Sequence, residues 1–314
     1  MDNVRWGIEA EFGVNAAGAA AGVYARGLSC EDVLHGYHCD CPACSFSDYD
    51  GQMVWPLRGQ TDSSCSGEII SMPLTFDNLY NDGTNLWTAQ DILAGLCDAA
   101  IVADAEPDLN SGFHVHVNIQ DISPRFNRGS ALLAFYLWER FLTTLAGGRW
   151  QTQREGANIS IERSMRVYCA DTLFCDPSPV RRADYAALVL DWNAERRRDF
   201  ADFHNERDRH SNLNTRTRYG TWEFRLWNAT RSASRMEMFV RLSLAMMNPA
   251  IYQQLRLVDT STLDHSTLTT IFLEILGEGR TYDLVQAQTA YQAAVGTVPS
   301  GFRAVSYTHL RAHE

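Results

Sequence analysis

The sequence predicts an α+β protein, in which a sheet packs helices on one face and holds a polar, charged cleft on the other. Strand-like segments are separated along the chain by long amphipathic helices, an order typical of the α+β class. Three of these strands have apolar side chains on one face and ionisable side chains on the other. The chain has 314 residues, of which 45% are hydrophobic, which is enough for a substantial core.

The N-terminal part of the chain is expected to form short strands and loops. Residues 4–14 read as the first strand, and the Ala/Gly-rich residues 15–29 as a loop. A cysteine-rich segment at 30–44 precedes a short strand over 52–58. The stretch 60–74 combines a polar turn with a strand that a proline ends.

The middle of the chain alternates long helices with strands. Apolar residues at helical spacing predict helices over 87–104, 129–146 and 181–203. Alternation with period 2 predicts strands over 112–119, within the stretch SGFHVHVNIQ, and over 219–228, which reads YGTWEFRLWN.

Further helices are expected after the last strand. One begins near Ser234 with a capping box that Glu237 completes. It should break or bend near Asn248–Pro249, because proline lacks the backbone N–H that a helix interior requires. Two more helices are expected over 266–277 and 282–295.

The polar faces of the three central strands carry an unusual set of side chains. They are Glu9 and Glu11 on the first strand, His114, His116 and Asn118 on the second, and Glu223 and Arg225 on the third. Carboxylates are the ligands that hard cations such as Mg²⁺ prefer, and histidine can complete the shell. Arginine adds a fork that fits phosphate or carboxylate. A solvated polar face is the alternative for each strand taken alone.

Composition excludes several classes of function. The formal net charge is −11, and nucleic acids and anionic membranes both require a basic surface, so neither is an expected partner. All 27 basic residues are arginine, which rules out a Walker lysine and a Schiff-base lysine. Without a signal peptide or a membrane span, the eight cysteines favour reduced thiols and a cytoplasmic location.

The last ten residues, VSYTHLRAHE, look foreign to the rest of the chain. They are similar to the translation of a sequencing adaptor, a contaminant of metagenomic reading frames, here from a bacterial or phage source. We therefore expect residues 305–314 to be a non-native tail.

The cysteine-rich segment is a candidate zinc site. Structural zinc takes four nitrogen or sulfur ligands in a tetrahedral array. The candidate ligands are Cys30, Cys39, Cys41 and Cys44, with His35 or His38 as alternates. Reduced thiols in a loop are the alternative, since the spacing C-x-C-x-x-C is not that of a paired zinc knuckle.

Four short motifs, in order along the chain, resemble those of the amidoligase family. They are GIEAEF, TDSSCSGEIISMPL, SGFHVHVN and TWEFRLWNAT, and they span about residues 5–230. That family has the glutamine synthetase / γ-glutamylcysteine ligase (carboxylate–amine ligase) fold. The resemblance implies a curved, mainly antiparallel sheet with a metal-lined cleft, in a single catalytic domain over 1–304 that carries the insertion 30–44.

The resemblance also implies roles for individual residues. Magnesium would be held by Glu9, Glu11, Glu68, His114, His116 and Glu223. ATP would be contacted by His114, His116 and Arg225, and catalysis would depend on Arg225, Glu223, Glu68 and Asp62. Asp62 stands in a DSS turn where the family has a DGS-like turn, so this chain lacks the glycine of that motif.

The implied reaction is ATP- and Mg²⁺-dependent formation of an amide bond through an acyl-phosphate. The acid and the amine could be small molecules, peptides or protein side chains. Two alternatives use the same glutamate–histidine face: a metal-dependent hydrolase that activates water, and a non-catalytic metal- or ligand-binding module. Dependence of turnover on ATP separates the ligase from the hydrolase.

Overall fold

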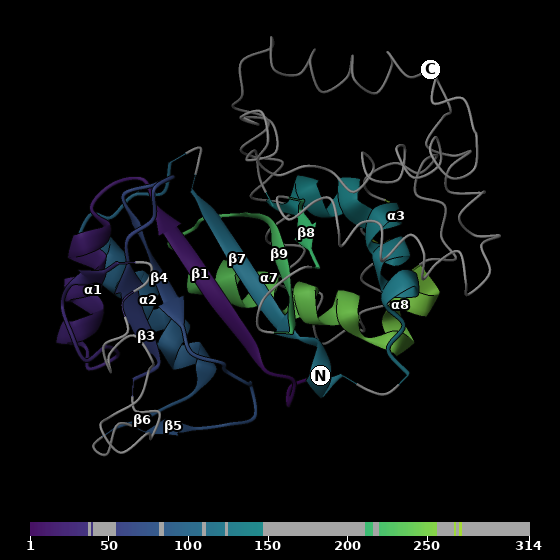
Figure 1. The fold of residues 1–314 in the computed structure, drawn as a ribbon, viewed down its shortest axis with the longest axis horizontal. Helices are drawn as coiled ribbons and strands as arrows, with labels where there is room; N and C mark the ends of the chain where they lie inside the picture. The colour runs from purple at the N-terminus through teal and green to yellow at the C-terminus, as the bar shows by residue number, and fades with distance from the viewer. Residues whose placement is uncertain are drawn as a thin grey trace, which may run out of the picture. The chain divides into compact units, whose positions relative to one another are not determined.

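The structure is a computed structural model, and its described residues form two compact units (Figure 1). The residues that the structure describes are 1–36, 39, 55–81, 85–108, 111–122, 125–146, 211–215, 220–255, 267 and 270–271. One unit comprises 1–123, 146–158 and 210–244, and the other comprises 124–145, 159–209 and 245–314. The single catalytic domain over 1–304, with its insertion at 30–44, stays a prediction, and the suspected tail 305–314 lies outside the described residues.

An open seven-stranded sheet forms the first unit, in the order β2-β3-β4-β1-β7-β9-β8. Every neighbouring pair is antiparallel except β2–β3, which confirms the mainly antiparallel prediction. The strands are β1 (Trp6–Phe12), β2 (Leu34–His35), β3 (Leu57–Gln60), β4 (Gly67–Ser71), β7 (Gly112–Asn118), β8 (Leu213–Asn214) and β9 (Thr221–Asn228). In Figure 1, β1, β7 and β9 lie side by side, so the three strands with ionisable faces are neighbours.

The Ala/Gly-rich stretch after β1 is a helix, α1 (Ala16–Ala25), and the loop expected over 15–29 is wrong. Alanine is the strongest helix former, and small side chains let the helix approach the sheet closely. A Cβ atom placed on Gly59 of β3 would lie 2.9 Å from Cβ of Ala20, and one on Gly67 of β4 would lie 3.0 Å from Cβ of Ala16. Glycine in the strands and alanine in the helix therefore allow the packing together.

A second helix, α2 (Ala89–Val102), packs against α1 and agrees with the prediction over 87–104. It begins with a capping box, in which Thr88 and Asp91 satisfy each other's backbone N–H groups. Ahead of it lies a small hairpin of β5 (Tyr80–Asn81) and β6 (Leu86–Trp87).

The helix α7 (Ala233–Met247) covers the apolar face of β7 and β9, behind which it runs in Figure 1. The Phe239 ring stacks on Trp227, with centroids 4.7 Å apart, and contacts Phe113. The indole N–H of Trp227 donates to Oγ of Ser243. The apolar face of the sheet thus packs helices, as predicted.

The start of α7 differs from the predicted capping box. The helix begins at Ala233, so Ser234 lies inside it. The carboxylate of Glu237 accepts hydrogen bonds from Arg241 and Gln90. The predicted break is confirmed, because α7 ends at Met247 and α8 begins at Pro249.

The second unit contains α3 (Arg128–Ala146) and α8 (Pro249–Leu255). The Trp138 indole N–H donates to the carbonyl of Leu255, and the Tyr252 hydroxyl accepts from the backbone N–H of Asn127. The helices predicted over 181–203 and 282–295 lie outside the described residues, as does most of 266–277. Within the part of the chain that is described, no helix is long and apolar enough to cross a membrane.

Candidate active site

Strand register brings the ionisable side chains of the three central strands together on one face, called here the polar face. Residues directly opposite each other in neighbouring strands point to the same side of a sheet. The opposed pairs are Glu9 with His114, Glu11 with Glu68, His116 with Glu223, Gln60 with Glu68, and Asn214 with Glu223.

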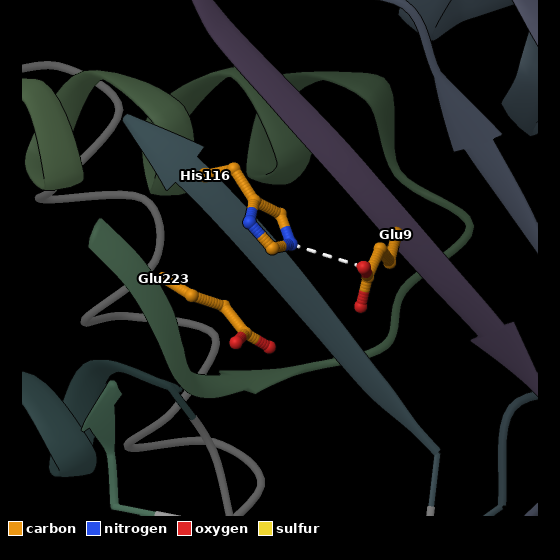
Figure 2. A group of neighbouring side chains, drawn as sticks. All are labelled: Glu9, His116 and Glu223. Atoms are coloured by element: carbon orange, nitrogen blue, oxygen red, sulfur yellow. Dashed lines mark hydrogen bonds and ion pairs between the residues drawn. The ribbon is translucent and has the colours of Figure 1, made fainter. Parts of the chain in front are cut away.

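Three of these side chains form a compact group that could hold a metal ion. One ligand atom from each of Glu9, His116 and Glu223 lies within 4.8 Å of the other two. Figure 2 shows them converging from β1, β7 and β9, with Nε2 of His116 3.0 Å from Oε1 of Glu9. The side chains of Glu9 and His116 are 29% and 20% exposed, so two of the three members remain partly accessible to solvent, whereas Glu223 is buried.

His114 and Glu11 lie deeper in the polar face. His114 is 1% exposed, and its Nδ1 lies 2.8 Å from Oε2 of Glu9 and 3.5 Å from Oε1 of Glu223. Its Nε2 lies 3.5 Å from Oε1 of Glu11, whose other oxygen accepts the backbone N–H of Gly112. His114 therefore orients the carboxylates, whereas His116 presents its ring where a ligand can reach it.

Glu223 is held by two partners. Nδ2 of the buried Asn214 donates to its Oε2 over 2.8 Å, and Nη1 of Arg225 donates to its Oε1. The Arg225 side chain is 24% exposed, so its guanidinium is also accessible from solvent.

A bulge between β7 and β9 determines which β9 side chains reach the polar face. Phe113 pairs with Trp227 and Val115 with Phe224, so two β9 residues, Arg225 and Leu226, face the single residue His114. Strict alternation from Glu223 would put Trp227 on the polar face. The bulge returns Trp227 to the helix-covered face, where it stacks on Phe239.

Glu68 is held by a residue that the sequence analysis missed. Nε2 of the buried Gln60 donates to Oε1 of Glu68 over 2.8 Å, and Oε1 of Gln60 accepts from Nη2 of Arg58. The predicted strand 52–58 stopped short of Gln60. Extending it by two residues would have put Arg58 and Gln60 on one face. Asn214 lies in a strand of only two residues, which is too short for an alternating pattern to be visible in the sequence.

The charges of the compact group stabilise one another. Burial alone would raise the pKa of Glu9, but the charge of His116 and hydrogen bonds from His114 and His116 hold that pKa well below its usual value. Burial likewise acts against the charge of His116, yet Glu9 raises its pKa overall. Despite burial, the pKa of Glu223 is lowered, chiefly by Arg225. Carboxylate and guanidinium charges are therefore retained here at neutral pH.

Glu68 has the opposite character. Burial, followed by repulsion from Glu9, Asp62 and Glu11, raises its pKa from 4.5 to about 9. This carboxyl group is thus protonated at neutral pH unless a cation compensates the surrounding negative charge.

Two predicted polar residues serve local turns. Oδ1 of Asn118 accepts the backbone N–H of Gln120, at the start of the 3₁₀ turn η2 (Ile119–Asp121). Oδ1 of Asp62 accepts hydrogen bonds from the backbone N–H of Ser64, over 2.6 Å, and from the Ser64 hydroxyl. The charge of Asp62 also contributes to the raised pKa of Glu68. Asp62 therefore lies at the edge of the polar face.

The described part of the cysteine-rich segment includes Cys30, His35 and Cys39. His35 and Cys39 are in contact. Cys41, Cys44 and His38 lie outside the described residues.

Comparison with known proteins identifies one family. Residues 52–247 match the family model described as "Putative amidoligase enzyme". The matched span includes β4, β7 and β9 with their polar-face residues, while Glu9 and Glu11 of β1 precede it. No curated protein and no solved structure matches the chain.

Proposed function

The chain belongs to the amidoligase family, and from this premise we propose that it is an ATP- and Mg²⁺-dependent ligase. It joins a carboxylate to an amine through an acyl-phosphate. The observation that carries the proposal is the convergence of Glu9, His116 and Glu223 from three strands, with Arg225 bound to Glu223 at the same point.

The donor set fits magnesium. Carboxylate oxygens with one histidine nitrogen suit a hard divalent cation better than a soft one. Among the described residues of the polar face, carboxyl groups outnumber arginines, since Glu9, Glu11, Glu68 and Glu223 share the face with Arg225 and Arg58. The pKa of Glu68 is raised by burial and by the neighbouring carboxylates, and the second of these causes reflects the same excess of negative charge. A divalent cation would relieve it.

Glu9, His116 and Glu223 would form the centre of the magnesium site, and Glu11 and Glu68 would complete its acidic side. Bound magnesium would neutralise the phosphate oxygens of ATP and fix their positions. His114, buried between Glu9 and Glu11, would keep their carboxylates in place whether or not the cation is bound.

Arg225 is assigned to the transferred phosphoryl group. Burial acts against its charge, but the carboxylates of Glu223, Glu9 and Glu11 raise its pKa, so it stays a cation throughout. Its contact with Glu223 fixes the guanidinium beside the proposed metal site. Phosphoryl transfer depends mainly on such positioning and charge stabilisation.

The chemistry then takes two steps. A substrate carboxylate oxygen bonds to the γ-phosphorus of ATP as ADP leaves, which produces the acyl-phosphate. The amine nitrogen attacks the acyl carbon, the carbon–oxygen bond to phosphate breaks, and phosphate departs. A bound cation would ionise Glu68 by compensating the surrounding negative charge, and we then assign the proton lost by the amine to its Oε2, since Oε1 is held by Gln60; Asp62 lies beside it at the edge of the face.

The test is release of ADP and phosphate that requires both a carboxylate and an amine. Hydroxylamine serves as a general amine, because it traps acyl-phosphates as hydroxamates, and amino-acid and peptide carboxylates serve as the acids. Glu9→Gln, Glu11→Gln, His116→Ala and Arg225→Ala are each expected to lower this turnover by ~10²-fold or more. Mn²⁺ binding, followed by electron paramagnetic resonance, gives a measurement that does not depend on the substrate.

The matched control is Glu106→Gln, because Glu106 lies outside the polar face and its side chain is 46% exposed. Wild-type turnover and Mn²⁺ affinity in Glu9→Gln and His116→Ala would show that the polar face is not the active site. Turnover that proceeds without ATP would instead support the metal-dependent hydrolase.

A further inference from the structure

The His116 ring, assigned above to the magnesium site, is contacted at both of its nitrogens. Nε2 lies 3.0 Å from Oε1 of Glu9, on the side of the compact group (Figure 2). Nδ1, on the other side of the ring, lies 3.4 Å from Oγ1 of Thr221. A ring with a partner at each nitrogen has a restricted orientation, so Thr221 contributes to the direction in which Nε2 points.

The pairing of β7 with β9 brings Thr221 to this position. His116 is opposite Glu223, and Thr221 lies two residues before Glu223, so Thr221 and His116 are diagonal neighbours on the polar face. The backbone just before Thr221 is also held, because the N–H of Ile119 donates to the carbonyl of Gly220 over 3.2 Å. Gly220 has a φ of 68°, a conformation that favours glycine, and thereby sets the entry into β9.

A hydroxyl at this position suits a histidine that alternates between two partners. When one nitrogen of a neutral histidine binds a metal, the other carries the proton and donates it to a neighbour. A hydroxyl both donates and accepts hydrogen bonds, whereas an ionised carboxylate only accepts. Thr221 can therefore donate to Nδ1 while Nε2–H is bonded to Glu9, and can accept from Nδ1–H when Nε2 is a ligand.

The neighbouring His114 is placed differently. Its Nδ1 lies 2.8 Å from Oε2 of Glu9 and its Nε2 lies 3.5 Å from Oε1 of Glu11. Both nitrogens of His114 thus face carboxylates, and the side chain is 1% exposed, so neither nitrogen is accessible to an incoming cation. The hydroxyl contact distinguishes His116 as the histidine that is arranged to bind a metal.

We propose that Thr221 is a positioning residue of the magnesium site. Its hydroxyl accepts the Nδ1 proton of His116 and so keeps the lone pair of Nε2 directed at the cation. The inference rests on the proposed function, because it takes His116 as a ligand. Loss of a partner that orients a ligating histidine typically lowers metal affinity by about 10–100-fold.

The experiment measures the Mn²⁺ affinity of the full chain by electron paramagnetic resonance in the wild type, Thr221→Val and Thr221→Ser. Valine has the shape of threonine without the hydroxyl and is equally suited to a strand, so Thr221→Val should lower the affinity by about 10–100-fold. Serine keeps the hydroxyl, so Thr221→Ser should bind Mn²⁺ as the wild type does.

Nitrogen-15 NMR of the histidine rings gives a second measurement that does not depend on affinity. The His116 signals are assigned by their absence from the spectrum of His116→Ala. In the wild type saturated with Mg²⁺, the His116 proton should be on Nδ1 and Nε2 should carry none. A proton on Nε2 of His116 in that spectrum would overturn the proposal.

The matched control is Thr230→Val, which removes a threonine hydroxyl beyond the end of β9, where it accepts the N–H of Ser232 over 3.2 Å. This variant should keep full Mn²⁺ affinity. Wild-type affinity in folded Thr221→Val would overturn the proposal, and so would an equal loss in Thr221→Ser or in Thr230→Val. Circular dichroism establishes folding, and the wild-type NMR spectrum decides the matter if Thr221→Val does not fold.

The variant His116→Ala separates failure of this inference from failure of the proposed function. Wild-type Mn²⁺ affinity in His116→Ala would refute the metal site itself, and the role of Thr221 with it. Reduced affinity in His116→Ala together with wild-type affinity in Thr221→Val would overturn only the role of Thr221.

Discussion

Replacing Glu68 with glutamine should stabilise the metal-free protein while impairing its proposed function. The Glu68 side chain is buried, and its pKa is raised to about 9 by burial and by the carboxylates of Glu9, Asp62 and Glu11. Glutamine has nearly the same shape, and its side-chain oxygen can still accept the hydrogen bond from Gln60. The substitution therefore removes the titration and leaves the packing unchanged.

The magnitude follows from the two pKa values. A group whose folded pKa lies above its unfolded value stabilises the folded state most at low pH, and that contribution is lost as pH rises from the unfolded toward the folded pKa. Here the window runs from 4.5 to about 9. At pH 7, about 2.5 pH units above the unfolded pKa, the carboxyl group is ionised in the unfolded chain and must take up a proton when the protein folds. This proton uptake lowers the free energy of unfolding by about 3 kcal/mol.

The assay is urea unfolding in EDTA at pH 5, 7 and 8.5, with Glu106→Gln as the exposed control. Glu68→Gln should be more stable than wild type by about 3 kcal/mol at pH 7, by less than about 1 kcal/mol at pH 5, and by more at pH 8.5. Magnesium should stabilise the wild type more than the variant, because it favours the ionised carboxylate. A variant no more stable than wild type, or a difference that does not change with pH, would refute the electrostatic reasoning.

Three further changes test other parts of the structure. Asn214→Leu removes the amide that holds Glu223 and should lower Mg²⁺ affinity by about 10–100-fold, as measured by Mn²⁺ competition, whereas unchanged affinity would contradict its positioning role. Thr88→Ala removes the cap of α2 and should lower the free energy of unfolding by about 1 kcal/mol in a urea titration; no change would mean the cap contributes nothing. Gly22→Val places a side chain against Ala99, whose Cβ would lie 2.9 Å from the new Cβ, and should lower the free energy of unfolding by about 1–3 kcal/mol in the same titration. No loss of stability would show that α1 and α2 can move apart freely.

The strands and their ionisable faces could be predicted because their signal is local. Alternation within β7 put Phe113, Val115 and Val117 on one side and the histidines on the other, and all three apolar residues are fully buried. The same reasoning placed the polar residues of β1 and β9. Period-2 alternation needs no knowledge of the neighbouring strand.

The prediction of a loop over residues 15–29 was wrong because the Ala/Gly-rich composition of this stretch is ambiguous. Alanine favours a helix, whereas glycine disfavours one. Contact with Gly59 and Gly67, more than thirty residues further along the chain, allows the helix to pack on the sheet. The capping box was misplaced because the spacing of Ser234 and Glu237, which is typical of a helix start, also occurs inside helices.

By itself, the sequence determined which side chains share a face within each strand, and hence that Glu9, His116 and Glu223 could be ligands. Only the tertiary structure decided that these three converge, while His114 lies beneath them. It also placed Gln60 and Asn214 beside Glu68 and Glu223. The reason is physical: strand order, register and the bulge depend on hydrogen bonds between segments about a hundred residues apart, so the sheet as a whole must form before those side chains meet.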